Sequence, residues 1–218
     1  MGIKCAVVPV TPFQQNCSVF WCEETMKGAI VDAGGDLDRV KQVIERYKVI
    51  PEKLLVTHSH LDHASGVAQL AEDLDVPIEG PHPDDQFLID ALPEQAAKYG
   101  FPPARSFTPT RWLAHGDKVT VGNVVLDVAH CPGHTPGQVV FIDPATRLAF
   151  VGDVLFKGSV GRSDFPRGNH EHLVSSIRDR LFPLGDDITF VSGHGETSTF
   201  GFERKCNPYV SDLAVGAG

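Results

Sequence analysis

The sequence of 218 residues has few cysteines and no long apolar run. Its five cysteines are odd in number and scattered, which favours reduced thiols over a disulfide framework. No apolar run approaches the ~20 residues that cross a bilayer. Residues 1–10 also lack the basic and apolar pattern of a secretory leader. We therefore expect a cytoplasmic protein that is not inserted in a membrane.

Positive charge is scarce as well. The formal net charge is −9, with no block of basic residues. Such a surface repels phosphate backbones and anionic lipids, so we expect neither a nucleic acid nor a membrane as a partner. Repeats, low-complexity tracts and a linker are also missing, which predicts a single domain over residues 1–218. The sequence leaves open whether the protein is a monomer or a small homo-oligomer.

Short apolar segments separated by turn residues predict strands, and amphipathic segments predict helices. Predicted strands cover residues 3–10, 17–22, 29–32, 53–57, 76–78, 118–121, 124–130, 138–142, 148–151 and 188–191. Predicted helices cover residues 36–48, 64–74, 84–99 and 170–181, and a glycine-rich loop covers residues 158–168. Strands followed by helices, twice over, indicate an α/β (α+β) fold of two sheets with helices on the outer faces.

Histidine is unusually abundant, with ten residues in the chain. Four segments that carry imidazole or carboxylate groups each follow a predicted strand, where side chains from neighbouring strands can converge. These segments are residues 57–63, 132–137, 151–153 and 192–195. They supply five histidines and two aspartates as candidate metal ligands, namely His58, His60, Asp62, His63, His134, Asp153 and His194. No thiolate is required, which points to zinc, with iron or manganese as alternatives.

Seven ligands are too many for one tetrahedral ion. They suit two divalent ions, each with three protein ligands plus a shared carboxylate and a shared hydroxide. Two ions about 3.5–4 Å apart can lower the pKa of a bridging water and polarise a carbonyl together. Glycines beside His134, Asp153 and His194 let the backbone turn sharply close to the ions. A closed structural zinc site is disfavoured, because such sites are typically rich in cysteine.

These segments resemble the metallo-β-lactamase superfamily, and within it the glyoxalase II group (hydroxyacylglutathione hydrolases), over essentially the whole chain. The first metal motif marks only the superfamily. The resemblance to the short bacterial YcbL-type members is carried by residues 15–17, 32–35, 130–137, 152–156 and 161–168. It implies a four-layer αββα sandwich with the metals at one edge.

The same resemblance implies a role for each ligand. His58, His60 and His134 would hold the first ion. Asp62, His63 and His194 would hold the second ion, and Asp153 would bridge the two. A metal-bridging hydroxide, oriented by Asp62, would attack the thioester carbonyl of an S-acylglutathione such as S-lactoylglutathione. Many zinc β-lactamases carry cysteine in the place of Asp153, so antibiotic hydrolysis is the lesser expectation.

The sequence departs from full-length glyoxalase II in its substrate-binding parts. Those enzymes carry a C-terminal helical region with basic residues that grip glutathione, whereas this sequence ends soon after Tyr209. Asp164 stands where they place a tyrosine. Arg162, Arg167 and Lys157 are the candidates to hold a substrate carboxylate, since a guanidinium fork pairs well with one. An equal alternative is that Arg162 or Arg167 pairs with Asp164 and braces the loop.

The leading prediction is a glyoxalase II-like thioesterase that acts on a small, glutathione-derived thioester. One rival is a glutathione persulfide dioxygenase, which would bind a single iron through the counterparts of His58, His134 and Asp153. A second rival is a non-catalytic metal-binding module. Lactonase and phosphodiesterase activities also stay open, because a fold does not determine a substrate.

Overall fold

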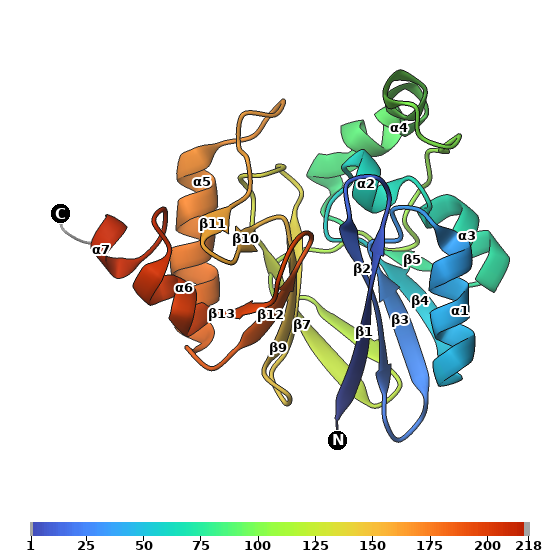
Figure 1. Ribbon diagram of the computed structural model, residues 1–218, viewed down its shortest axis with the longest axis horizontal. Coiled ribbons are helices and arrows are strands. Elements are labelled where there is room, and N and C mark those ends of the chain that lie inside the picture. The colour runs from blue at the N-terminus through green and yellow to red at the C-terminus, as the bar shows by residue number, and fades with distance from the viewer. Residues whose placement is uncertain (1, 216–218) are drawn as a thin grey trace.

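Two β-sheets face each other in the middle of the computed structural model, which describes residues 2–215 (Figure 1). The first sheet contains, in sequence order, β1 (Ile3–Val10), β2 (Gln15–Cys22), β3 (Lys27–Val31), β4 (Ile50–Leu55) and β5 (Ile78–Glu79). The second contains, in spatial order, β13 (Ser198–Thr199), β12 (Thr189–Ser192), β9 (Leu148–Gly152), β8 (Val139–Asp143), β7 (Val124–His130) and β6 (Lys118–Val121). A separate ribbon pairs β10 (Leu155–Phe156) with β11 (Ser159–Val160).

Helices cover the outer face of each sheet (Figure 1). The first sheet is covered by α1 (Leu37–Tyr47) and α3 (Val67–Leu74). The second is covered by α5 (His170–Ser175), the π-helical segment η2 (Ser176–Leu181), the turn η3 (Phe182–Leu184) and α6 (Phe200–Cys206). The remaining helices are α2 (Leu61–Ala64), η1 (Pro83–Asp85), α4 (Gln86–Tyr99) and α7 (Asp212–Val215). Within residues 2–215, no helix has the length and apolar character to cross a membrane.

Apolar burial explains why these layers stack. Between the sheets, Phe20 of β2 stacks on Phe150 of β9 with ring centroids 5.2 Å apart. Separate apolar clusters lie between each sheet and its helices. Nearly every residue of β2 is buried, because helices cover one face of its sheet and the second sheet covers the other. This arrangement confirms the predicted four-layer αββα sandwich.

The predicted elements differ from the structure most clearly in four places. The helix predicted over residues 64–74 is divided by Ser65 and Gly66, and a Cβ atom on Gly66 would lie 2.6 Å from the carbonyl oxygen of Ala33. The glycine-rich loop contains β11, and the helix predicted over residues 170–181 changes to π-helical geometry at Ser176. The elements after β12 were not predicted, although the Thr199 hydroxyl accepts from the backbone N–H of Phe202 and caps α6.

Candidate metal centre

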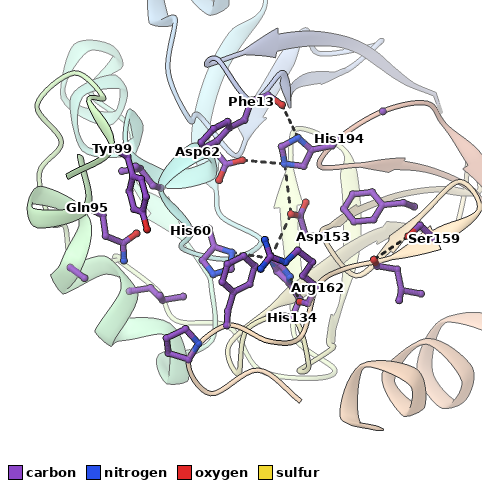
Figure 2. Close-up of a pocket in the computed structure, with 18 of the residues that line it drawn as sticks. Phe13, His60, Asp62, Gln95, Tyr99, His134, Asp153, Ser159, Arg162 and His194 are labelled. Carbon is purple, nitrogen blue, oxygen red and sulfur yellow. Dashed lines mark hydrogen bonds and ion pairs between the residues drawn. The ribbon is translucent and has the colours of Figure 1, made fainter. Parts of the chain in front are cut away.

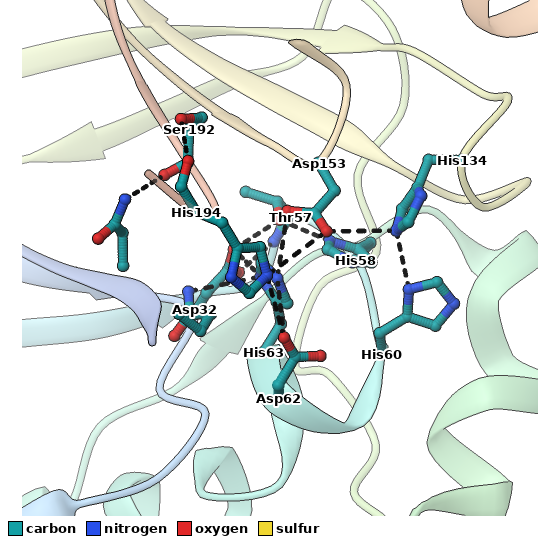
Figure 3. Close-up of polar contacts among 12 residues, drawn as sticks. Asp32, Thr57, His58, His60, Asp62, His63, His134, Asp153, Ser192 and His194 are labelled. Carbon is teal, nitrogen blue, oxygen red and sulfur yellow. Dashed lines mark hydrogen bonds and ion pairs between the residues drawn. The ribbon is translucent and has the colours of Figure 1, made fainter. Parts of the chain in front are cut away.

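The seven predicted ligands come together at one edge of the sandwich (Figure 3). The strands β7, β9 and β12 run in the same direction, since β12 pairs with β9 in parallel and β8 pairs antiparallel with both β7 and β9. Their carboxyl ends therefore meet, and each is followed by a candidate ligand. Two triads have ligand atoms within 4.8 Å of one another, namely His58, His60 and His134, and Asp62, His63 and His194.

Asp153 lies between the two triads. Its Oδ1 atom is 3.3 Å from Nε2 of His63, and its Oδ2 atom is 3.5 Å from Nε2 of His134. The Oδ2 atom is also 3.7 Å from Nε2 of His194. The side chain thus faces ring nitrogens of both triads, as a carboxylate shared by two cations would.

Hydrogen bonds on the far side of each ring determine which nitrogen faces the centre. Nδ1 of His134 donates to the carbonyl oxygen of Arg162 at 2.7 Å, so its Nε2 accepts from Nδ1 of His60 at 2.8 Å. Nδ1 of His194 donates to the carbonyl oxygen of Phe13 at 3.1 Å. Such outer partners hold metal-binding imidazoles in the required tautomer and orientation.

Asp32 orients two further ligands in the same way, one from each triad. Its Oδ2 atom accepts from Nδ1 of His63 at 2.9 Å and from the hydroxyl of Thr57 at 2.6 Å. That hydroxyl in turn lies 3.1 Å from Nδ1 of His58 and accepts from it. Asp32 is 2% exposed, so this anchor is shielded from water. Asp32 is not among the predicted site residues, although it lies in the segment 32–35 that carries the family resemblance.

The centre has buried donor atoms that lack a partner. Nε2 of His58, Nε2 of His63 and Oδ1 of Asp153 have no hydrogen bond within the described part of the chain. A buried polar atom without a partner costs roughly 1–3 kcal/mol. The lone pair of His58, the ring nitrogen of His63 once it has released its proton, and the carboxylate oxygen fit divalent cations, which would satisfy all three at once.

The pKa values of the histidines shift in opposite directions in the two triads. Burial lowers the pKa of His58 well below its ordinary range, and burial lowers the pKa of His60 to about 3. Both rings are therefore neutral and able to bind a metal. Burial also lowers the pKa of His63, but the facing carboxylates of Asp153 and Asp62 outweigh it and hold that pKa well above the ordinary value. The second triad thus attracts positive charge.

Asp85 is a second buried anchor, and it is not among the residues predicted for the site. This fully buried carboxylate accepts from the backbone N–H of Ser59 at 3.1 Å, the hydroxyl of Thr135 at 2.9 Å and the backbone N–H of Gly137 at 2.7 Å. It therefore connects the loop of His58 and His60 to the loop of His134. Burial raises the pKa of Asp85 to about 6. No local pattern identified it, because its partners lie far away in the sequence.

Gly193 shows how closely the chain approaches the centre. A Cβ atom at this position would lie 2.0 Å from Oδ1 of Asp153 and 2.6 Å from Cε1 of His63. Any side chain here would displace two candidate ligands. The expectation that glycines beside the ligands permit close approach holds at this residue.

A cavity of about 1040 Å³ opens over the candidate ligands (Figure 2). We call the ligands that line it the floor of the cavity: His60, Asp62, His134, Asp153 and His194. Of the predicted substrate-binding residues, Lys157 and Arg162 line the cavity, whereas Arg167 is not among the lining residues. Instead, the guanidinium of Arg167 stacks 4.1 Å from the ring centroid of Phe87.

Both of these predicted substrate-binding cations already have acidic partners. Arg162 forms a two-pronged pair with Asp164 at 3.0 and 2.9 Å, and Lys157 pairs with Glu196. The first pair is the loop-bracing arrangement that the sequence analysis left open beside substrate binding. Whether either cation also holds a substrate stays a prediction.

Another group of possible ligands, His82, Asp84 and His130, lies outside the cavity lining. The two imidazole rings stack at 4.1 Å with an interplanar angle of 12°, so their lone pairs run parallel and do not converge on one point. Nε2 of His130 is also held by the carbonyl oxygen of Pro136 at 2.8 Å. This geometry is that of a stacked pair of rings.

Comparisons with known proteins agree with the geometry. The sequence matches the family model described as the metallo-beta-lactamase superfamily over residues 10–194. It is 45% identical to the hydroxyacylglutathione hydrolase GloC of Haemophilus influenzae, over 94% of this chain and 97% of that protein. Among solved structures, it resembles the BLEG-1 B3 metallo-beta-lactamase (TM-score 0.87, 30% identity, 95% of this chain and 99% of that one). It also resembles TTHA1623 in a di-iron-bound form (TM-score 0.84, 34% identity, 94% and 99% covered).

The chain therefore belongs to the metallo-beta-lactamase superfamily. Members of this family bind divalent metals, and the two triads of this chain have the composition that such ions require. The protein is accordingly a metal-dependent hydrolase of this family.

Proposed function

We propose that the protein is a glyoxalase II-like thioesterase, which cleaves an S-acylglutathione such as S-lactoylglutathione into a hydroxy acid and glutathione. One observation carries the proposal: two triads lie under one cavity, with Asp153 facing both. The 45% identity to a protein named hydroxyacylglutathione hydrolase supports the substrate class. We also infer a cytoplasmic location, supported by five cysteines that are all free within residues 2–215.

We infer that the centre holds two divalent ions, zinc first, with iron or manganese as alternatives. His58, His60 and His134 would hold one, Asp62, His63 and His194 the other, and Asp153 would be shared. Two such ions supply Lewis acidity and lower the pKa of a bound water. A similar solved structure is a di-iron-bound form, so the metal analysis should measure iron as well as zinc.

The residues of the chain have separate tasks in this proposal. Asp62 uses Oδ2 toward His194, 3.1 Å away, which leaves Oδ1 available at the floor to orient the attacking water. Asp32 and Asp85 hold the ligand loops in place through buried hydrogen bonds. Lys157 and Arg162 are the candidates to attract a substrate carboxylate. The thiolate leaves readily, so no strong general acid is needed.

The deciding experiment is a thiol-release assay on S-lactoylglutathione, with metal content measured on the same sample. Non-glutathione thioesters and lactones should be assayed beside it. We expect thioester turnover with about two metal ions per chain. Asp62→Ala should remove turnover, whereas Asp127→Ala, an exposed residue paired with Lys118, should not.

Two results would reject this function. One iron per chain with oxygen uptake on glutathione persulfide, and no thioester turnover, would identify the dioxygenase. Bound metal with no turnover of any substrate, and the same properties in Asp62→Ala, would identify a non-catalytic module.

A further inference from the structure

The cavity above the floor is lined from two sides, and each side offers a different kind of patch. Figure 2 shows Gln95 and Tyr99 of α4 on one side of His194 and Asp153, and Ser159 on the other. On the α4 side, the apolar Phe87, Leu88 and Ala91 share one face of the helix, and we call these three residues the α4 wall. The lining of α4 then continues into polar and aromatic residues, namely Glu94, Gln95, Lys98 and Tyr99. We call Lys157, Arg162 and Glu196 the charged wall, although apolar side chains such as Phe156 and Val160 also line the cavity. A bound thioester would therefore meet an apolar patch at the α4 wall and paired charges at the charged wall.

The α4 wall is held rigidly beside the floor. The opposite face of α4, including Ile89 and Leu92, packs in an apolar cluster with Leu61 and Ala64 of α2. Since α2 also carries Asp62, the helix that lines the cavity and the helix that carries a candidate ligand share one core. The wall therefore keeps its position relative to the reacting group.

Phe13 adds an aromatic ring to the cavity. It lies in the turn between β1 and β2, and its carbonyl oxygen accepts from His194. The residue is 55% exposed, although it stands directly beside the candidate ligands. An apolar group that covered this ring would remove that surface from water.

A lactoyl group fills little of this space. The cavity of about 1040 Å³ lies at the upper end of the roughly 300–1,000 Å³ usual for sites that hold drug-sized ligands. A lactoyl group offers one methyl and one hydroxyl, and a hydroxyl has no polar partner among Phe87, Leu88 and Ala91. The glutathione carboxylates match the charged wall better, because two lining cations, Lys157 and Arg162, belong to it, whereas α4 contributes one, Lys98.

We propose that the α4 wall is a subsite for an apolar acyl group, so that the preferred substrates are thioesters with an extended aliphatic or aromatic acyl chain. The proposal rests on the thioesterase function proposed above and specifies its substrate class. In this orientation the glutathione part lies along the charged wall. The acyl chain lies on Phe87, Leu88 and Ala91.

The reaction is the same hydrolysis with a different acyl group. The oxygen of water forms a bond to the thioester carbonyl carbon, and the carbon–sulfur bond breaks. The thiolate leaves with the bonding electron pair and takes up a proton from the water, so a carboxylic acid and a thiol result. No oxidant or co-reactant is needed.

The test compares acyl groups on the metal-loaded, full-length protein. We expect kcat/KM for S-hexanoylglutathione to exceed that for S-lactoylglutathione at least about tenfold, since each buried methylene contributes roughly fourfold. Ala91→Gln puts an amide in the α4 wall and should lower that ratio roughly fivefold or more. Ala97→Gln, an exposed alanine of the same helix outside the lining, is the matched control and should keep it.

A binding measurement keeps the test independent of turnover. S-hexylglutathione should bind at least about tenfold more tightly than S-methylglutathione, and Ala91→Gln should reduce this difference. A protein that hydrolyses thioesters but prefers the lactoyl group would overturn the subsite alone. Equal effects of Ala91→Gln and Ala97→Gln would do the same. If no thioester is hydrolysed at all, the thioesterase function itself is refuted.

Discussion

The floor of the cavity and its charged wall are built in different ways. The candidate ligands are oriented by buried anchors, since Asp32 is 2% exposed and Asp85 is fully buried. The wall consists of exposed ion pairs, and the side chains of Arg162 and Asp164 are each 69% exposed. Buried hydrogen bonds that would leave an unpaired group when broken are costly to lose. Exposed pairs contribute little and rearrange easily. We infer that the chemistry depends on a rigid floor, whereas substrate charge meets an adaptable wall.

Loss of the shared carboxylate should have the largest effect. Asp153→Ala should reduce both metal content and thioester turnover at least about 100-fold, because even outer partners of a metal ligand contribute about 10–100-fold. Elemental analysis and thiol release measure the two quantities on one sample. The control is Asp127→Ala, in an exposed pair on β7. Full metal content in Asp153→Ala would show that the floor does not depend on this residue.

Asp85→Asn tests whether an anchor that touches no ligand is still part of the floor. The amide cannot accept all three hydrogen bonds, so we expect metal affinity to fall about 10–100-fold. Chelator competition measures the affinity, and the visible spectrum of the cobalt-substituted protein reports a changed ligand geometry. Asp84→Asn is the neighbouring exposed control. An unaltered cobalt spectrum in Asp85→Asn would confine this residue to general folding.

The pH dependence of stability should reveal the burial of Asp85. Its pKa is raised from 3.8 to about 6, so the fold binds this proton more tightly than the unfolded chain does. The proton stabilises the fold below the unfolded pKa, and this contribution is lost as pH rises through about 6. Between pH 7 and pH 5 the metal-free protein should gain about 1 kcal/mol relative to Asp85→Asn. Urea unfolding of both proteins measures the difference. A constant difference across this range would contradict the assignment.

The charged wall should give the smallest effect. Arg162 is already paired with Asp164, so Arg162→Gln should raise KM for S-lactoylglutathione only about two- to fivefold and leave kcat unchanged. Arg105→Gln, which breaks an exposed pair with Glu72 outside the cavity lining, is the control. A rise in KM of about 100-fold would contradict the proposed difference between the rigid floor and the adaptable charged wall, since Arg162 would then behave like a buried site residue.

The fold class and the candidate ligands could be predicted because they depend on local patterns. Strand-forming runs end at His58, His134, Asp153 and His194 or just before them, and strand ends meet at a sheet edge. The elements after β12 were missed, because β13 and α6 are too short for a clear period. That residues 1–218 form a single domain remains a prediction.

The amino-acid sequence by itself determined which side chains could bind metal and in what order they follow the strands. Only the tertiary structure decided which nitrogen of each ring faces the centre, since the donors and acceptors behind the rings come from distant segments. Asp85 is 26 residues from Ser59 and 52 from Gly137, and Asp32 is 31 from His63. The same folding set α4 beside the floor. Contacts of this kind have no sequence period, because burial and chain direction in three dimensions select them.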